Sequence, residues 1–307
     1  MEPLISICIC TYNRPFIYEC LMSLAALKVP NSFRLECVVV DNCKQQSGRV
    51  FVERAGEQLT IPVRYYVEPR KNICLARNLC VAHAKGQWIT FIDDDELVAE
   101  DWLTQLMDAA IEFKASVVMG SVIASYPENT PKWIVDGDYF NRTLSPRGTE
   151  INVGATNNVL IYKDHLPQRQ GPFDSDYGIT GGGDTELFNT MHNQGRRIVT
   201  CPQAKVFETV EKKRLNADYL LKRSIRIGEV YARVFFKDKW RVNSLIGFIR
   251  AIFLTIVASA LHAFARVTHA KGSFRYQLMQ RANYGKVRYF LNVERIEIYG
   301  KHKEGQN

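Results

Sequence analysis

The sequence lacks the cysteine pairs of a zinc site and the glycine fingerprint of a dinucleotide-binding fold. Its eight cysteines include no CxxC pair, which argues against zinc. They are scattered among apolar residues, a pattern more typical of a reducing compartment than of a disulfide framework. The chain has no GxGxxG motif, and this disfavours a dinucleotide Rossmann site. We also find no internal repeat.

The N-terminus does not have the pattern of a secretory signal peptide. Glu2 is acidic, and the first apolar run breaks at Thr11–Arg14. We therefore expect a cytoplasmic protein.

The overall composition is ordinary, but the charge is distributed unevenly. The chain has 307 residues, 46% hydrophobic and 23% charged, so it can bury a full core. From Lys205 onward there are 21 Lys and Arg against 8 Asp and Glu, whereas residues 1–204 have 19 against 24. An acidic front and a basic back indicate a partner with negative charge: nucleic acid, a phosphorylated substrate or an anionic membrane.

An apolar segment, Trp88–Ile92, ends abruptly in four carboxylates, Asp93–Glu96. If this segment is a buried parallel strand, the acids stand at its carboxyl end, where open α/β sheets bind ligands. Adjacent carboxylates repel one another unless something positive joins them. Mg²⁺ or Mn²⁺ with a substrate phosphate is the natural partner. The alternative is a solvated acidic loop, with Asp95 or Glu96 at the start of the next helix.

Strand and helix patterns alternate over the first two hundred residues. We predict strands at 4–10, 35–40, 63–67, 88–92, 116–123, 154–162 and 198–201. We predict helices at 18–25, 72–84, 101–113 and 184–193. Polar residues follow several of the strands. This alternation is typical of a right-handed, mostly parallel α/β sheet.

Residues 125–150 interrupt the alternation and are rich in Pro, Asn, Asp and Gly. A loop of this length inside a compact domain is usually functional. Trp133 within it belongs either to a small local core or to a platform on which a sugar stacks.

Three glycines precede an acidic residue in the segment Thr180–Leu187. Glycine permits positive φ or a close approach of the backbone to a ligand, so Gly182 and Gly183 are candidates for acceptor binding. Asp184 begins the next predicted helix. It is either a helix cap or a functional side chain.

The C-terminal part combines a basic helix with an apolar one. We predict a basic amphipathic helix over 215–236, carrying Lys222, Arg223, Arg226 and Arg233. Residues 242–267 are apolar apart from Arg250, His262 and Arg266. We predict no element for the Tyr-, Arg- and Lys-rich end of the chain.

The apolar segment 242–267 predicts contact with a membrane. Its charge-free run, 251–261, is shorter than the roughly 18–20 residues of a spanning helix, although snorkelling of Arg250 extends it. With its basic neighbours it indicates a membrane-seated helix or a re-entrant hairpin on an anionic leaflet. The alternative is a core helix of a C-terminal helical cap.

Five short motifs occur in the order and spacing of a known family: Cys10–Pro15, Val39–Asn42, Ala76–Asn78, Phe91–Asp95 and Gly183–Leu187. Over roughly residues 4–230 the sequence resembles the family 2 glycosyltransferases, and within them the bacterial exopolysaccharide-assembly enzymes. The resemblance implies a GT-A fold and a nucleotide-sugar donor. UDP is the commonest donor nucleotide in this family. It also implies a divalent cation, Mg²⁺ or Mn²⁺, and inversion at the anomeric carbon.

The resemblance also implies roles in donor binding. Residues expected to line the nucleotide pocket are Thr11, Tyr12 and Arg14. Asp41 would accept a hydrogen bond from the base, and Arg77 would lie near the base or the diphosphate.

The acidic motifs match the metal site and the base of the family. Asp93 and Asp95 match its DxD motif, in which the first residue serves the ribose or the metal and the last the metal; we place Asp94 with the donor site. Asp184 matches the catalytic base. Many relatives have a metal-binding His near the position where this sequence has Glu208, so Glu208 is a candidate third ligand.

We therefore predict an α/β GT-A catalytic domain over residues 1–235, followed by a helical, membrane-associating extension over 236–307. The catalytic domain is divided into a nucleotide-binding half, 1–100, and an acceptor half, 101–235. The predicted function is inverting sugar transfer in surface polysaccharide biosynthesis. The acceptor would be a glycan or a polyprenyl-diphosphate-linked glycan at the cytoplasmic face of the inner membrane.

Two alternative functions remain open from the sequence. A metal-dependent phosphohydrolase could use Asp93–Asp95, but it would not explain the Thr11–Arg14 turn or the glycine-flanked Asp184. A non-catalytic module that binds nucleotides or nucleic acid would explain the basic half. There the positive charge lies beside apolar sequence rather than interleaved aromatics, so we expect a membrane partner and no nucleic acid.

Overall fold

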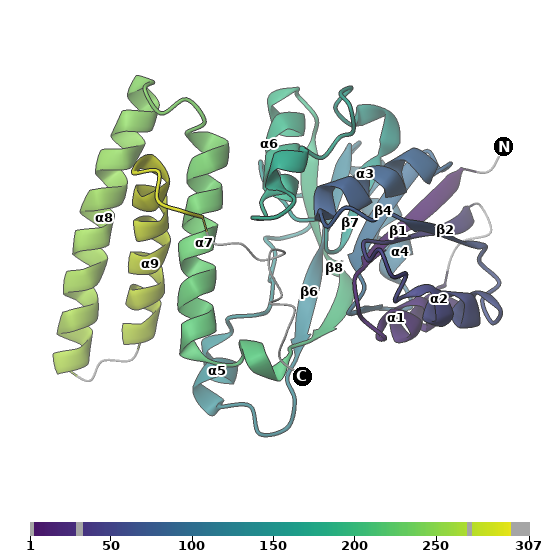
Figure 1. Cartoon of the computed structure of the whole chain (residues 1–307), viewed down its shortest axis with the longest axis horizontal. Helices are drawn as coiled ribbons and strands as arrows, with labels where there is room; N and C mark the ends of the chain where they lie inside the picture. The colour runs from purple at the N-terminus through teal and green to yellow at the C-terminus, as the bar shows by residue number, and fades with distance from the viewer. Residues whose placement is uncertain (1–2, 29–32, 269–271, 296–307) are drawn as a thin grey trace.

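The computed structural model describes residues 3–28, 33–268 and 272–295. An eight-stranded sheet is covered by helices on both faces, and three long helices stand beside it (Figure 1). The strands are β1 (Leu4–Thr11), β2 (Arg34–Asp41), β3 (Val63–Val67), β4 (Trp88–Asp93), β5 (Glu96–Val98), β6 (Val117–Ser125), β7 (Val159–Tyr162) and β8 (Ile198–Thr209). Their order in the sheet is β3-β2-β1-β4-β7-β6-β8-β5.

The N-terminal half of the sheet is parallel. Strands β3, β2, β1 and β4 pair in parallel, and the register places Thr11 beside Asp41 and Cys10 beside Asp93. The polar residues that end these strands therefore meet at one edge of the sheet, as predicted.

The other half of the sheet is mixed. Strand β7 is antiparallel to β4 and β6, whereas β8 is parallel to β6 and antiparallel to β5. The prediction of a mixed, mostly parallel sheet is confirmed.

Two predicted strand boundaries in this half were wrong. Strand β7 begins at Val159 rather than at 154, because Asn158 has a φ of 77° and its side chain bonds the carbonyl groups of Ser121 and Ala204. Strand β8 continues past 201 to Thr209, and its second half alternates between buried and exposed residues. A strand with one solvated face gives a weaker apolar signal than the buried strands.

Six α-helices belong to the described α/β part: α1 (Ile17–Ser23), α2 (Arg49–Gly56), α3 (Ile73–His83), α4 (Trp102–Glu112), α5 (Lys132–Gly137) and α6 (Gly183–Asn193). A seventh, α7 (Ala217–Phe235), borders it. Helices α1, α2 and α4 pack on one face of the sheet, and α3 and α6 on the other. Alternate residues of β1 feed the two cores: Ile7 and Ile9 face one, Cys8 the other. The predicted loop 125–150 contains the short helix α5.

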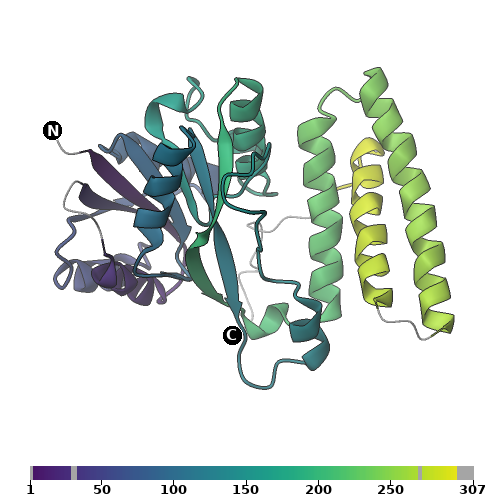
Figure 2. The ribbon, with the colours of Figure 1, turned by 180° about the vertical axis from the view of Figure 1, so that it is seen from behind.

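Helix α7 joins α8 (Val242–Val267) and α9 (Ser273–Phe290) in a three-helix unit, with α9 between the other two (Figures 1 and 2). Helices α7 and α9 approach closely through glycine: a Cβ at Gly228 would meet Ala282 O at 1.8 Å. Helix α9 lies in the predicted helical extension, but its bounds were not predicted, because the amphipathic pattern of this segment is weak. It packs against both α7 and α8. Residues 269–271 and 296–307 of the predicted extension lie outside the described residues.

Helix α8 is one unbroken helix with two different faces. Its buried residues recur every seven positions and are small: Ser244, Ala251, Ala258 and Ala265. Most of its large apolar residues are exposed, and only 17% of its most apolar 18-residue window is buried. By length and composition α8 could cross a membrane. The re-entrant hairpin and the buried core helix were both wrong for this segment.

Candidate active site

The strand ends bring together three residues predicted for the donor site, Thr11, Arg14 and Asp94, and the predicted metal ligand Asp95. Thr11 donates a hydrogen bond from Oγ1 to Asp94 Oδ2 over 2.7 Å. Arg14 Nη1 lies 2.8 Å from Asp94 Oδ1 and 2.6 Å from Asp95 Oδ2, and its Nη2 lies 3.1 Å from Glu211. The Thr-Tyr-Asn-Arg turn after β1 is thus bonded directly to the acidic turn after β4.

The acidic turn is electrostatically strained. Burial raises the pKa of Asp94 to about 6, although Arg14 opposes the shift. Burial and the charge of Asp93 raise the pKa of Asp95 to about 6 as well. Burial raises the pKa of Asp93, opposed by Arg77, whose Nη2 is 3.9 Å from Asp93 Oδ1. These carboxylates have less positive charge around them than their number requires.

Glu96 adds a buried carboxylate that the sequence did not single out as a site residue. It pairs with Glu208 in the register of β5 and β8. Its Oε2 accepts a hydrogen bond from the Asp93 backbone over 2.8 Å, but its Oε1 is buried without a partner among the described residues. Burial, together with the charge of Asp93, raises the pKa of Glu96 well above its usual range.

The chemistry of this cluster fits a hard divalent cation. Asp93, Asp95 and Glu208 offer only oxygen ligands, the type that Mg²⁺ and Mn²⁺ prefer. The raised pKa values and the unpartnered Glu96 oxygen indicate that added positive charge would be favourable here. Glu208 is paired with Arg214, and across the described ranges no three acidic, His or Cys side chains form a ready-made metal cluster. A cation would therefore require these side chains to rearrange.

Asp41 has a structural task that the sequence did not reveal. Its Oδ1 accepts from Cys43 N over 2.8 Å, and its Oδ2 accepts from Gly48 N over 2.7 Å and from Tyr65 OH over 2.8 Å. The carboxylate is fully buried. It holds the loop after β2 in place; a contact with the nucleotide base stays a prediction.

Tyr12 and Arg77 lie on the loop and helix around the same sheet edge. Tyr12 is partly exposed, with the Lys71 ammonium 4.8 Å from its ring centroid. Arg77, on α3, is largely buried with its guanidinium 5.8 Å from the ring of Phe173. The roles of Tyr12 and Arg77 in donor binding stay predictions.

A large cavity of about 1,170 Å³ lies between the sheet and α7. Asp184 and Glu208 both line it, from α6 and from β8. Asp184 is the second residue of α6, where the helix dipole favours a carboxylate. The cavity therefore joins the predicted base to one member of the acidic cluster.

The two glycines before Asp184 permit a positive φ and close packing against neighbouring helices. Gly182 has a φ of 100°, and a Cβ there would meet Val230 Cγ1 at 2.7 Å. Gly182 also lines the large cavity. Gly183 is buried, and a Cβ there would meet Cys74 Sγ at 2.4 Å, so it packs against α3.

Arg142 is a site residue that sequence reasoning missed. Burial lowers its pKa, and the opposing charges come from Glu96, Asp184, Asp93 and Glu208. It lines the large cavity and donates from Nη2 to Asn157 O over 3.0 Å. Arg142 thus lines the same cavity as Asp184 and Glu208. The signal was the segment 125–150, which was predicted to be functional without a named charge.

Trp133 lies in a local aromatic cluster on α5. Its ring centroid is 6.0 Å from that of Tyr139 and 5.2 Å from that of Phe274. This is the small-core alternative considered for Trp133. Neither of the two cavities described here includes it, so a sugar contact stays a prediction.

Comparisons with known proteins agree with this geometry. The family model described as glycosyl transferase family 2 matches residues 6–166. The succinoglycan biosynthesis protein ExoM of Rhizobium meliloti is 33% identical over 302 residues, covering 96% of each chain. The glycosyltransferase AglE of Haloferax volcanii is 23% identical and covers 77% of this chain and 76% of its own.

Solved structures show the fold. The mannosyltransferase PcManGT from Pyrobaculum calidifontis, in complex with GDP-Man and Mn²⁺, has a TM-score of 0.68 at 17% identity, covering 96% of this chain and 89% of that one. TarS 1–349 from S. aureus, in complex with UDP-GlcNAc, has a TM-score of 0.51 at 16% identity, covering 94% and 92%. The predicted GT-A fold and the predicted family are both confirmed. The chain belongs to glycosyltransferase family 2 and is a glycosyltransferase.

Proposed function

We propose that the enzyme transfers a sugar, with inversion, from a nucleotide-sugar donor to a glycan or lipid-linked glycan during the assembly of a surface polysaccharide. The relative ExoM is named for succinoglycan biosynthesis, and the structures of PcManGT and TarS contain GDP-Man and UDP-GlcNAc. The observation that carries the proposal is that Arg142, Asp184 and Glu208 line one cavity, so the predicted base and one member of the acidic cluster open onto a common space. Donor and acceptor sites on either side of it would present the two reacting groups to one another.

The donor would occupy the edge where β1, β2 and β4 end. Thr11 and Arg14 already contact Asp94 and Asp95 there, so the nucleotide would bind against a preformed network. Arg77, beside Asp93, would lie near the diphosphate. We favour a UDP-sugar, as the family resemblance implies.

Asp184 would act as the general base. It lines the large cavity at the start of α6, where an acceptor hydroxyl would enter from the side opposite the donor. Removing the proton of that hydroxyl as it attacks the anomeric carbon contributes about 10²–10⁴-fold in rate for bases of this kind. Attack from the face opposite the leaving nucleoside diphosphate inverts the anomeric configuration.

Asp93 and Asp95 would hold a divalent cation, with Glu208 as a further ligand once it leaves Arg214. The bound ion would supply positive charge on the donor diphosphate. The same charge would relieve the repulsion that raises the pKa values of Asp93 and Asp95.

We place the enzyme on the cytoplasmic face of the inner membrane through α8. Ten large apolar residues on its outer face are exposed: Val242, Leu245, Ile246, Ile249, Ile252, Phe253, Ile256, Leu261, Phe264 and Val267. Trp240, 85% exposed, and Arg241 precede the helix, as at a membrane interface.

The packing of α8 favours a helix that lies in the membrane surface over one that spans it. Its inner face is covered by α9, which carries Arg275, Arg281, Lys286 and Arg288. Surrounding α8 with lipid would either bury these charges in hydrocarbon or detach α9. An in-plane helix leaves the basic residues beside the anionic headgroups.

The proposed function is tested by incubating the full-length protein with UDP- and GDP-sugars and Mn²⁺. We expect one donor to raise the melting temperature and to be hydrolysed slowly to the nucleoside diphosphate in the absence of acceptor. Binding with no turnover of any donor would contradict the proposal of an active transferase.

A further inference from the structure

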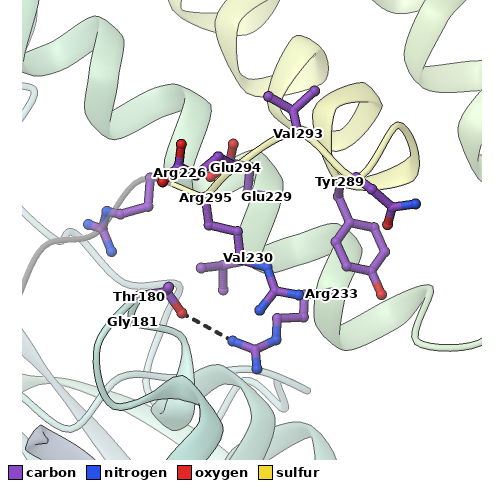
Figure 3. A pocket seen from close by; sticks show the side chains of 11 residues that line it. Thr180, Gly181, Arg226, Glu229, Val230, Arg233, Tyr289, Val293, Glu294 and Arg295 are labelled. Carbon is purple, nitrogen blue, oxygen red and sulfur yellow. Dashed lines mark hydrogen bonds between the residues drawn. The ribbon is translucent and has the colours of Figure 1, made fainter. Parts of the chain in front are cut away.

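A second cavity, of about 380 Å³, lies between the loop before α6, helix α7 and the end of α9. Four residues of α7 at helical spacing form one wall: Arg226, Glu229, Val230 and Arg233. Thr180 lies on the opposite side, and Arg295 follows α9 (Figure 3). We call this space the arginine cavity.

Arg233 is held in the arginine cavity by neutral groups. Its Nη1 donates to Thr180 Oγ1 and its Nη2 to Asp176 O, each over 3.1 Å. Its guanidinium lies 3.6 Å from the ring centroid of Tyr177. Within the described chain no carboxylate forms an ion pair with Arg233. Its orientation is therefore fixed without an ion pair, although the nearby charges of Asp176 and Asp174 partly offset its own.

The other two arginines bring further positive charge to the same space. Burial lowers the pKa of Arg233, and although Tyr177 opposes the shift, the charge of Arg295 adds to it. Figure 3 shows the guanidinium groups of Arg233 and Arg295 beside one another below Glu229. Arg226 likewise has no ion pair with a described residue. Burial is the main cause that lowers the pKa of Arg223, and the positive charge of Arg226 is a further cause. Like charges held this close favour a bound anion.

Acidic residues only partly offset this charge. Glu229 is already bonded to Arg288, with 2.6 Å between Oε1 and Nε. Glu294 is the remaining acid among the described residues that line the cavity, opposite three arginines.

The arginine cavity adjoins the large cavity that Asp184 lines. Arg226 and Val230 line both spaces. The loop Thr180–Gly182 passes from the arginine cavity directly to Asp184 in the larger cavity. An anion bound by the arginines would therefore belong to a molecule that can also reach the predicted base.

We propose that the arginine cavity binds the diphosphate through which the acceptor glycan is attached to its lipid. The proposal deepens the proposed function and rests on it. Arginine donors match phosphate oxygens in bidentate geometry, and three of them suit a diphosphate better than a single carboxylate. The walls, α7 and α9, belong to the same three-helix unit as α8, the helix that we place at the membrane.

Calorimetry with geranyl diphosphate, in EDTA so that the metal-dependent donor site is not engaged, tests the proposal on the full-length protein. We expect Arg226→Ala and Arg233→Ala to weaken binding about tenfold or more, because each removes a charge-assisted contact. Lys222→Ala is the matched control: it removes an exposed charge of α7 that lines neither cavity, and it should bind like the wild type. Arg226→Ala disturbs no described hydrogen bond, so a loss of binding there cannot be attributed to the loop that Arg233 holds.

Three outcomes would overturn the proposal. The first is equal binding by all four proteins. The second is equal affinity for inorganic pyrophosphate, which would indicate a site for the free anion. The third is arginine-dependent binding to phosphatidylglycerol vesicles without binding of geranyl diphosphate, which would indicate a lipid headgroup site. Nucleotide binding with Mn²⁺, measured in parallel, should be unchanged in Arg233→Ala; its absence from the wild type would instead contradict the proposed function.

Discussion

Arg14 and Asp95 form a short ion pair, with 2.6 Å between Nη1 and Oδ2. The same nitrogen lies 2.8 Å from Asp94, so one guanidinium serves two neighbouring carboxylates. Asp95 is also the residue we propose as a ligand of the divalent cation. Arg14 and the cation would therefore interact with the same negative charge and repel one another.

Replacing Arg14 should separate metal binding from nucleotide binding. In Arg14→Gln we expect Mn²⁺ alone to bind about three- to tenfold more tightly, because a like charge next to Asp95 is gone. Nucleotide affinity should fall, because a proposed pocket residue is lost. Calorimetry measures both, and Arg241→Gln, which removes an exposed pair with Asp238 in the C-terminal unit, is the control. Weaker Mn²⁺ binding in Arg14→Gln would show instead that Arg14 positions the carboxylates.

The acidic turn should also make stability depend on pH. The pKa of Asp94 is about 6 in the folded protein against an ordinary value of 3.8, so the folded state binds a proton that the unfolded state releases. This contribution to stability is complete below about pH 4 and is lost as pH rises through 6. Urea unfolding at pH 5 and pH 7.5 measures it, and Asp94→Asn should show a smaller difference between the two. Identical pH dependence in the two proteins would contradict the shift.

The parallel half of the fold and the strand-end motifs could be predicted from sequence because their signals are local. Each buried strand is a continuous apolar run, and the polar residues that follow it meet once the sheet forms. The family resemblance then assigned Thr11, Arg14 and Asp94 to the donor site and Asp95 to the metal. The ion pair from Arg14 to Glu211, 197 positions apart, had no such signal, since no periodicity links the two residues.

The acceptor side was predicted less completely because it depends on the packing of distant segments. Arg142 is recognisable only when the loop that carries it is folded against the large cavity that Asp184 and Glu208 also line. The arginine cavity requires α9, whose segment has no strong pattern of its own and acquires its place by packing on α7 and α8. The resemblance gave Asp41 a role in binding the base, but no sequence pattern showed that its oxygens also bond the following loop.

Asp184→Asn should stop transfer without preventing nucleotide binding. The amide keeps the shape of the side chain, and its oxygen can still accept the bond that Thr185 N donates over 2.8 Å, but it cannot take a proton. We expect the rate to fall by about 10²–10⁴-fold. Asp218→Asn is the matched control, because Asp218 is also the second residue of a helix but is exposed on α7. Normal turnover by Asp184→Asn would remove this residue from the mechanism.

Gly182→Ala should destabilise the junction of α6 and α7. A positive φ costs a residue with a Cβ about 1–2 kcal/mol, and here the new Cβ would also meet Val230 at 2.7 Å. Gly195→Ala isolates the first effect, since Gly195 has a φ of 77° with nothing within 4 Å of the added atom. Urea unfolding should therefore show a larger loss of unfolding free energy for Gly182→Ala. Val230→Ala in the same chain should recover part of the excess, and equal losses in the two single variants would contradict the clash.

The outer face of α8 offers the sharpest test of membrane attachment. Ile249 and Ile256 are 66% and 63% exposed, and changing both to Asn should weaken binding to phosphatidylglycerol vesicles about tenfold or more, because two apolar side chains no longer enter the lipid. The matched control changes Val50 and Ile111 to Asn; each is 64% exposed but lies on the catalytic domain. Vesicle sedimentation without detergent, and light scattering without lipid, measure the two proteins. Unchanged vesicle binding by the α8 variant would contradict the membrane seat, and dissociation of a lipid-free dimer by the same variant would assign the face to a second copy of the chain.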